Sequence, residues 1–326
     1  MKKIFLIMFS FIFLLCGCKR VNEDSIKKDL NKYINNIKGY HMVGKLDVYN
    51  GDNTFRYKVE SSKYKNNYRV SLLNRSNDHT QIIIRNSDAV YVLNPSLNKS
   101  YKFQSNWPEN SSQIYFIESI ISDLVNDKNM KILDKKNGYI LESKLMYTNN
   151  KNLSKEKVYL DKNLNLKKVE VYDDNKNLQM KFKVESLDKK AVFNDDYFDP
   201  DENMNVKEKE EDVINEIDDT IYPMYLPSGT YLSNEENIDT KNGERVILTF
   251  AGETPFIMVQ ETVDLENEEM SVSGDPEFIV DTVGAISDNS IEFISNGIMY
   301  YISSDEMNSH EMMQVAESLS PITVMK

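Results

Sequence analysis

Two stretches of the chain carry apolar residues at helical spacing, and a long region with a period of two separates and follows them. In the first stretch, 26–37, apolar residues recur every three or four positions and Gly39 follows, which predicts an amphipathic helix. The second stretch, at about 111–126, has the same spacing, with Asn110 or Ser111 available as its N-terminal cap. Each predicted helix packs one apolar face.

The period of two predicts strands with one buried face. Short strands are expected at 55–59, 68–72, 81–85, 89–93, 100–103, 131–133, 139–143, 157–160, 168–172 and 178–184. Clusters of Asn, Asp, Ser and Gly separate these strands, as at 50–53 and 74–78, and such residues favour turns. Connections this short join antiparallel neighbours, so the pattern predicts an antiparallel sheet.

A charged stretch without large aromatic residues, 201–220, interrupts the strand pattern and predicts an acidic linker. Strands resume in 221–326, where Lys241-Asn242-Gly243 predicts a hairpin turn. Ser303-Ser304-Asp305-Glu306 has the form of a capping box, so the last helix is expected to begin there, with Pro321 ending it. We therefore expect an N-terminal domain over 23–200 and a small C-terminal domain over 221–326.

The N-terminus has the composition of an export signal. Lys2 and Lys3 precede an apolar run, 4–15, that is shorter than the roughly 20 residues a membrane-spanning helix needs. The run ends in Leu15-Cys16-Gly17-Cys18, which resembles the lipobox of lipoprotein signal peptides. We expect a signal peptide over 1–17, a lipid on the Cys18 thiol, and a lipidated tether over 18–22 at the outer face of the cytoplasmic membrane. An ordinary secreted protein with two incidental cysteines is the alternative.

Both cysteines of the chain lie in this signal, so the mature protein would keep only the lipidated one. A disulfide, a zinc cluster and a thiol nucleophile are therefore not expected.

Charge is distributed unevenly along the chain. Residues 19–200 hold 32 basic and 24 acidic side chains, a net charge of +8, whereas 221–326 hold 3 basic and 19 acidic ones, a net charge of −16. A basic domain beside a membrane is attracted to anionic headgroups and an acidic one is repelled. The alternative is that both surfaces serve solubility alone. Nucleic acid is not an expected partner, because the export signal is accompanied by no nucleic-acid-binding motif.

No set of residues has the spacing of a catalytic or metal site. His41, His79 and His310 fall in unrelated elements. The sequence contains no Gly-rich phosphate loop, no nucleophile elbow and no zinc signature. Acidic runs such as 208–212 lack the ligand spacing of a calcium loop. The sequence therefore predicts a protein that is not an enzyme and that carries neither a metal nor another cofactor.

The inward-facing apolar residues of the first sheet form the candidate binding surface. An incomplete barrel can leave such residues around a cavity that takes an acyl chain or an apolar segment of a partner. The alternative is that they form the core beneath the two helices. The candidate cavity residues are Phe55, Tyr57, Val70, Leu72, Ile83 and Tyr91.

The order of these elements resembles the LolA-like fold of lipoprotein carriers and RseB-type regulators. The resemblance covers about 23–200 and includes Asn94-Pro95-Ser96-Leu97-Asn98, Trp107 and Tyr159-Leu160-Asp161-Lys162-Asn163. It is closest to clostridial and bacillar sporulation and germination lipoproteins of the YdcC and GerS kind. The segment that contains Leu226-Pro227-Ser228-Gly229 resembles a small domain of unknown function attached to such lipoproteins.

This resemblance implies an α+β fold: an incomplete antiparallel β-barrel, or half-barrel, with covering helices, plus a small C-terminal α+β domain. It also implies a non-enzymatic binding or scaffold protein that acts on an envelope protein in sporulation or spore germination. Two alternatives stay open, a carrier of lipid or lipoprotein acyl chains and an RseB-like regulator that binds an anti-sigma factor. Shuttling fits poorly, because a protein anchored at Cys18 cannot ferry cargo between two membranes.

Overall fold

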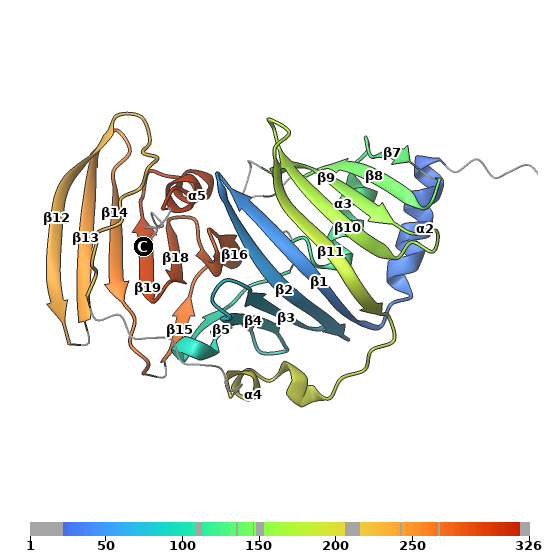
Figure 1. Ribbon diagram of the computed structural model, residues 1–326, viewed down its shortest axis with the longest axis horizontal. Coiled ribbons are helices and arrows are strands. Elements are labelled where there is room, and N and C mark those ends of the chain that lie inside the picture. The colour runs from blue at the N-terminus through green and yellow to red at the C-terminus, as the bar shows by residue number, and fades with distance from the viewer. Residues whose placement is uncertain are drawn as a thin grey trace, which may run out of the picture.

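Two β-sheets lie side by side along the long axis of the molecule in the computed structural model (Figure 1). The structure describes residues 22–108, 113–134, 136–145, 147, 153–205, 216–241, 243–266 and 268–319. The predicted signal peptide and Cys18 lie outside these ranges. Among the residues described, no helix has both the length and the apolar character that crossing a membrane requires.

The first sheet has twelve strands in the order β15-β6-β5-β4-β3-β2-β1-β11-β10-β9-β8-β7. Its first eleven strands in chain order pair antiparallel with one another, as the sequence predicts. The sheet is open, because its two ends, β7 and β15, are not neighbours. The eleven strands are β1 (Gly39–Asn50), β2 (Asn53–Tyr64), β3 (Asn67–Asn74), β4 (Thr80–Arg85), β5 (Val90–Asn94), β6 (Lys99–Phe103), β7 (Lys131–Asp134), β8 (Tyr139–Lys144), β9 (Leu153–Leu160), β10 (Leu166–Asp173) and β11 (Leu178–Asp188).

Two helices cover one face of this sheet. Helix α2 (Glu23–Asn35) begins at a capping box in which Asn22 and Ser25 bond each other's backbone N–H, and it buries Ile26 and Leu30. Helix α3 (Ile117–Asn126) buries Ile120, Ile121 and Leu124 among other residues. Together with the sheet they give the predicted half-barrel with covering helices, so the expected fold class is confirmed.

The expected start of the second helix at about 111 was wrong. Helix α3 begins at Ile117, and Phe116 stands at the N-cap without a side-chain hydrogen bond. The preceding residues Ile114 and Tyr115 are buried in a turn, and the Phe116 ring packs edge to face on Trp107 with centroids 5.0 Å apart. Burial of these aromatic rings thus holds the chain outside the helix. The candidate caps Asn110 and Ser111 lie outside the described residues.

The core face of the half-barrel is closely packed. A Cβ added to Gly44 on β1 would meet Cε2 of Phe182 at 2.5 Å and the carbonyl oxygen of Lys183 at 2.7 Å. The aromatic ring of β11 therefore occupies the space that a side chain at Gly44 would need. Alternating inward residues such as Leu46 and Val59 are buried in the same cluster.

The second sheet has seven antiparallel strands in the order β12-β13-β14-β19-β18-β17-β16. Thr240 pairs with Gly243 across the predicted hairpin turn, whose Asn242 lies outside the described residues. The strands are β12 (Thr230–Thr240), β13 (Gly243–Gly252), β14 (Phe256–Thr262), β16 (Asp275–Ile279), β17 (Thr282–Ile286), β18 (Ser290–Ser295) and β19 (Ile298–Ser303).

The last helix, α5 (Ser309–Glu317), starts later than its predicted capping box. Asn308 is the N-cap, and Glu311 completes the capping box. The hydroxyl of Ser304 instead accepts hydrogen bonds from the N–H groups of Glu306 and Met307 and donates one to the Pro255 carbonyl. These bonds fold residues 304–307 into a turn that ends β19. Pro321 lies outside the described residues.

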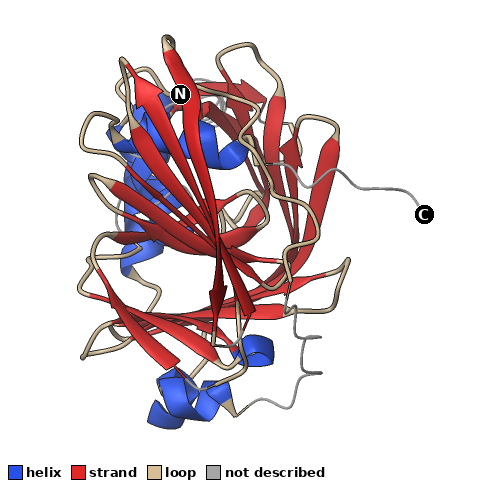
Figure 2. Ribbon diagram, turned by 90° about the vertical axis from the view of Figure 1, so that its left-hand side faces the viewer, coloured by secondary structure: helices blue, strands red, loops and turns tan. Residues whose placement is uncertain are grey.

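The described residues of the predicted linker, 201–205 and 216–220, are part of the fold. Helix α4 (Pro200–Met204) occupies its start, because Asp199 caps the helix and Pro200 suits its first position. A 3₁₀ turn, η3 (Asp195–Phe198), precedes α4. At the other end Ile217 packs on the core of the second sheet. Figure 2 shows α4 at the lower edge of the molecule, with the longer helices gathered on one side.

The C-terminal segment is not confined to its own sheet. Strand β15 (Glu268–Val272) leaves it and pairs in parallel with β6, so it forms one edge of the first sheet. The β16–β17 hairpin that follows divides its side chains between the two cores. Phe278, Val283 and Ala285 enter the half-barrel core, whereas Ile279 and Ile286 enter the core of the second sheet.

Candidate functional site

Five of the six predicted cavity residues gather on the core face of the half-barrel. Tyr57, Val70, Leu72 and Ile83 are buried in one cluster with α2 and α3, and Phe55 packs against that cluster. These five side chains therefore share one apolar face of the sheet, and helices cover it.

Tyr91 does not belong to this surface and is a correction to the predicted set. In the β4–β5 register Ile83 pairs with Val92, whereas Ile84 pairs with Tyr91. Neighbouring residues of a strand point to opposite faces, so Tyr91 lies on the outer face. There it packs in a separate cluster with Ile84 and Phe198, which η3 contributes. These strands are buried on both faces, and their nearly continuous apolar runs gave no alternation from which to choose a face.

The β16–β17 hairpin fills the open side of the half-barrel. The Phe278 ring meets the Tyr57 ring edge to face with centroids 5.5 Å apart, and the Tyr57 hydroxyl donates a 2.7 Å hydrogen bond to the Asp281 carbonyl. The Gln81 side chain bonds both backbone groups of Val283: its amide nitrogen donates to the carbonyl at 3.1 Å, and its oxygen accepts from the N–H at 2.7 Å. These contacts fix the hairpin to β2 and β4.

Little space remains beside these residues. The pocket lined by Tyr57, Leu72 and Gln81 has a volume of about 50 Å³. Sites for small organic ligands span roughly 300–1,000 Å³. The space beside Tyr57 holds a few water molecules and no acyl chain while the hairpin is in place.

The hairpin residues were not predicted as part of the site. Their sequence signal is the apolar run 278–280 followed by 282–286, which does not alternate. A short continuous apolar run indicates a strand buried on both faces, as this hairpin is between the two cores.

A buried lysine ties the C-terminal segment to the first sheet at the β6–β15 edge. Lys99 is 4% exposed, and its ammonium donates to Asp264 Oδ1 at 2.7 Å, to the Glu266 carbonyl at 2.8 Å and to Glu268 Oε2 at 3.2 Å. All three donor positions of the ammonium are used, which is what a buried charge requires.

Carboxyl groups are buried inside the half-barrel. Glu156 on β9 is fully buried; its Oε1 accepts a 2.7 Å hydrogen bond from Ser143, and its Oε2 has no partner among the described residues. Burial and the nearby Asp123 raise the pKa of Glu156 well above its ordinary value, and burial raises the pKa of Asp123 to about 6. On β16, the carboxylate of Glu277 accepts a hydrogen bond from the Phe278 N–H at 3.1 Å.

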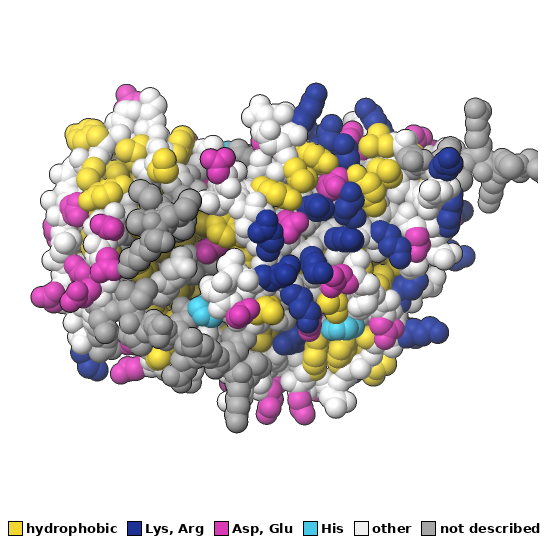
Figure 3. All heavy atoms as spheres, in the orientation of Figure 1, with side chains coloured by type: hydrophobic (Ala, Val, Ile, Leu, Met, Phe, Trp, Pro, Cys, Tyr) yellow, Lys and Arg dark blue, Asp and Glu magenta, His cyan; other side chains and the backbone are white. Residues whose placement is uncertain are grey.

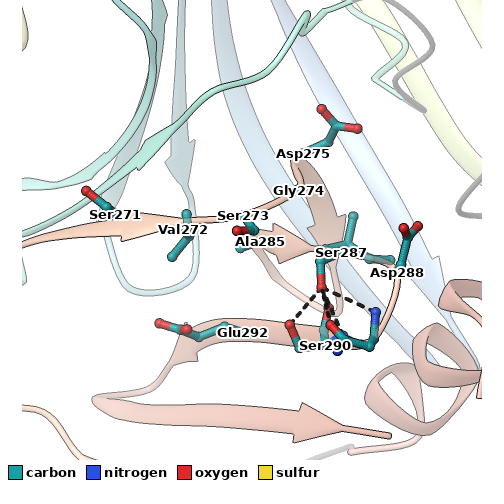
Figure 4. Close-up of a pocket in the computed structure, with 12 residues that line it drawn as sticks. Ser271, Val272, Ser273, Gly274, Asp275, Ala285, Ser287, Asp288, Ser290 and Glu292 are labelled. Atoms are coloured by element: carbon teal, nitrogen blue, oxygen red, sulfur yellow. Dashed lines mark hydrogen bonds between the residues drawn. The ribbon is translucent and has the colours of Figure 1, made fainter. Parts of the chain in front are cut away.

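A larger pocket, of about 550 Å³, opens between the β15–β16 and β17–β18 turns (Figure 4). Several of its polar groups form hydrogen bonds within the β17–β18 turn. The hydroxyls of Ser287 and Ser290 are hydrogen-bonded at 2.8 Å, and Ser287 Oγ also accepts a hydrogen bond from the Ser290 N–H at 3.0 Å. Its described lining contains serines and carboxylates but no basic or aromatic side chain. Across the described part of the chain, no group of three or more His, Cys, Asp or Glu side chains is placed to hold a metal ion.

The outer face of the first sheet is basic. Figure 3 shows Lys and Arg side chains gathered over the strands of this sheet, with acidic side chains more frequent over the second sheet. On β1, β2, β9, β10 and β11, strand alternation and register bring together on this face eight basic side chains, Lys45, Arg56, Lys58, Lys155, Lys157, Lys168, Lys181 and Lys183, and five acidic ones, Asp47, Glu60, Glu170, Glu185 and Asp188. This face therefore carries a net positive charge.

Solved structures with a detectable likeness have low identity. The MucA/MucB complex of Pseudomonas aeruginosa contains a chain that is 13% identical, with 90% of this chain and 98% of that chain covered and a TM-score of 0.34. The complex of the CwlD amidase from Clostridioides difficile with the GerS lipoprotein contains one that is 20% identical, with coverages of 54% and 98% and a TM-score of 0.30.

A curated relative is much more similar in sequence. Sporulation protein YdcC of Bacillus subtilis (strain 168) is 32% identical over 315 residues, which is 94% of this chain and 93% of the relative. The family model described as "Sporulation protein YdcC-like" matches residues 1–198. Both comparisons agree with the resemblance to the YdcC kind of sporulation protein expected from the order of elements. The chain belongs to the sporulation protein YdcC-like family.

Proposed function

We propose that this protein is a non-catalytic binding protein of the sporulation envelope, anchored by a lipid on Cys18 at the outer face of the cytoplasmic membrane. The process follows from its family, whose Bacillus subtilis member is named a sporulation protein. The anchor follows from the lipobox at Leu15-Cys16-Gly17-Cys18.

The filled interior of the half-barrel is the observation that favours a partner protein over an acyl chain as the ligand. The β16–β17 hairpin occupies the side on which an acyl chain would enter, through Phe278, Asp281 and Val283. A carrier would have to expel this hairpin from both cores before loading. A partner protein that docks on outer surfaces requires no such rearrangement, which favours a scaffold over an acyl-chain carrier.

Two measurements on sporulating cells test the proposal. Detergent phase partitioning of the native protein is expected to place it in the detergent phase, and the Cys18→Ala variant in the aqueous phase. Affinity purification of the native chain after mild cross-linking is expected to recover an envelope protein. A Cys18→Ala variant that still partitions with detergent contradicts the anchor; the absence of an envelope partner, together with normal spores from a deletion strain, contradicts the function.

A further inference from the structure

Four lysines stand in a row across neighbouring strands on the outer face of the first sheet. The register places Lys168 opposite Lys183, Lys183 opposite Lys45, and Lys45 opposite Lys58. Adjacent strands lie about 4.8 Å apart, so the row spans roughly 15 Å across β10, β11, β1 and β2. Like charges directly opposite one another destabilise a sheet. The fold itself gains nothing from this arrangement.

Carboxylates flank the row and form ion pairs with three of its four lysines. Lys45 pairs with Glu185 at 2.5 Å, Lys58 with Glu60 at 2.6 Å and Lys168 with Glu170 at 2.5 Å. Lys183 has no ion pair within the described ranges. The Lys45 and Glu185 side chains are 52% and 40% exposed, and ion pairs this exposed contribute little to stability. An external anion can therefore replace the carboxylate of such a pair at a small cost in free energy.

A second row runs parallel to the first. In it Lys181 lies opposite Asp47, which in turn lies opposite Arg56. Neither Lys181 nor Arg56 forms an ion pair in the described part of the chain. The two rows sit on strands whose inward residues, such as Leu46 and Phe182, are fully packed. The cations are therefore presented on a rigid surface.

We propose that this lysine row binds a linear polyanion whose negative charges repeat along an extended chain. The row lies on an outer sheet face, and no lysine of the row lines any of four pockets on the described residues, of about 550, 340, 60 and 50 Å³. A small anion would therefore lack enclosure there. An extended polymer needs only a line of cations, because each ammonium contacts one charge and releases counterions.

The choice of a polymer over the anchoring membrane rests on the proposed lipid at Cys18. Helix α2 packs through Ile26 and Leu30 on the face of the sheet opposite the lysine row. Cys18 precedes Asn22 by four residues, which reach roughly 14 Å at most. A helix about 10 Å across and the sheet itself separate α2 from the lysines, so the row does not lie flat on a membrane anchored through α2. It faces a ligand that approaches from the envelope.

The proposal is tested by measuring how the chain from Lys19 onward binds two polymers, inorganic polyphosphate and poly-L-glutamate. Comparison of the two shows whether the row prefers phosphate or carboxylate groups. The double variant Lys45→Gln/Lys183→Gln is compared with Lys28→Gln/Lys32→Gln, which makes the same charge change on the exposed side of α2. Titrations at several salt concentrations are expected to show saturable binding. In the row variant we expect at least ~10-fold weaker binding and a shallower dependence on salt, and in the α2 variant ~2-fold or less. Thermal melts verify that both variants fold.

Four outcomes overturn the proposal. The first three are no binding of either polymer at low salt, equal losses in both double variants, and binding of phosphatidylglycerol vesicles but not of polymers. The fourth is a lysine-dependent dimer seen by ultracentrifugation with no polymer binding, which assigns the row to the acidic half of a second copy. The chain used has no lipid, so none of these results bears on the anchor at Cys18.

Discussion

The Tyr57 ring on β2 and the Phe278 ring on β16 meet edge to face with their planes at 89°, and this contact joins the two halves of the chain. Tyr57 is 3% exposed and Phe278 is 6% exposed, so each ring covers the other from water. The hairpin that carries Phe278 also supplies Ile279 to the core of the second sheet. Because one hairpin belongs to both cores, we expect the two sheets to unfold together.

Replacement of Phe278 by Ala tests this coupling. Loss of a buried Phe side chain lowers the free energy of unfolding by about 3–5 kcal/mol, partly through the cavity that it leaves. Urea unfolding followed by fluorescence should show one transition at lower urea. The matched control is Ile257→Ala, because Ile257 is 45% exposed on β14 and its loss should change stability by about 0.5 kcal/mol or less. Equal stability of the Phe278 variant and the native protein would refute the packing described.

Removal of the Lys99 ammonium should destabilise the β6–β15 edge. The Lys99→Ala variant removes the cation that Asp264 and Glu268 share; because these carboxylates are 26% and 58% exposed and stay hydrated, the loss is roughly 1–3 kcal/mol. Amide hydrogen exchange is expected to accelerate first in β15. Lys241→Ala is the control: its ammonium lies 4.0 Å from Glu266 Oε1 and its side chain is 86% exposed, so no measurable change is expected. Unchanged exchange in β15 would contradict the role given to Lys99.

Buried acids should make the protein less stable as pH rises. The pKa of Asp123 is raised to about 6 and that of Glu156 well above its ordinary value, both chiefly by burial. Below about pH 4 both groups are protonated in the folded and the unfolded chain, so the stability that their neutral forms allow is fully present. Above it the unfolded chain loses protons first, so stability falls as pH rises through the folded pKa values. For Asp123 the fall is on the order of 2–3 kcal/mol at about 1.4 kcal/mol per pKa unit.

The Glu156→Gln variant isolates one of these groups. Its amide oxygen can accept the Ser143 hydrogen bond that Glu156 accepts, but the side chain cannot ionise. Urea unfolding at pH 4.5 and pH 7.5 should show a smaller loss of stability with pH in the variant than in the native protein. Identical pH dependence in the two proteins would mean that Glu156 does not titrate as its burial requires. Ser71→Ala, a half-exposed change on β3, serves as the control.

Local patterns predicted the helices and the antiparallel strands, and the family resemblance implied their half-barrel arrangement, but neither indicated what fills it. Helix α2 follows from the spacing of Ile26 and Leu30, and the strands follow from alternation such as Tyr57 and Val59, because both signals lie within a few residues. The face of Tyr91 was missed because its strand is buried on both sides. The start of α3 was missed because tertiary burial of Phe116 against Trp107 overrides helical spacing.

Long-range pairing explains the remaining differences. The parallel addition of β15 to β6 joins segments that are far apart in sequence, and no local motif specifies that pairing. The lysine row has the same origin, since Lys45 and Lys183 become neighbours only through the β1–β11 register. Composition showed the excess of positive charge in 19–200, whereas only the fold showed which of its lysines share a face.

The most direct test of the filled half-barrel is native mass spectrometry of the chain from Lys19 onward, purified without detergent. With the β16–β17 hairpin in place against Tyr57 and Gln81, the spectrum should show the mass of the polypeptide alone. Hydrogen exchange on the same sample should show strong protection of the Val283 amide, which donates to Gln81. A reproducible bound lipid, together with rapid exchange at Val283, would contradict a half-barrel filled by its own hairpin and would favour an acyl-chain carrier.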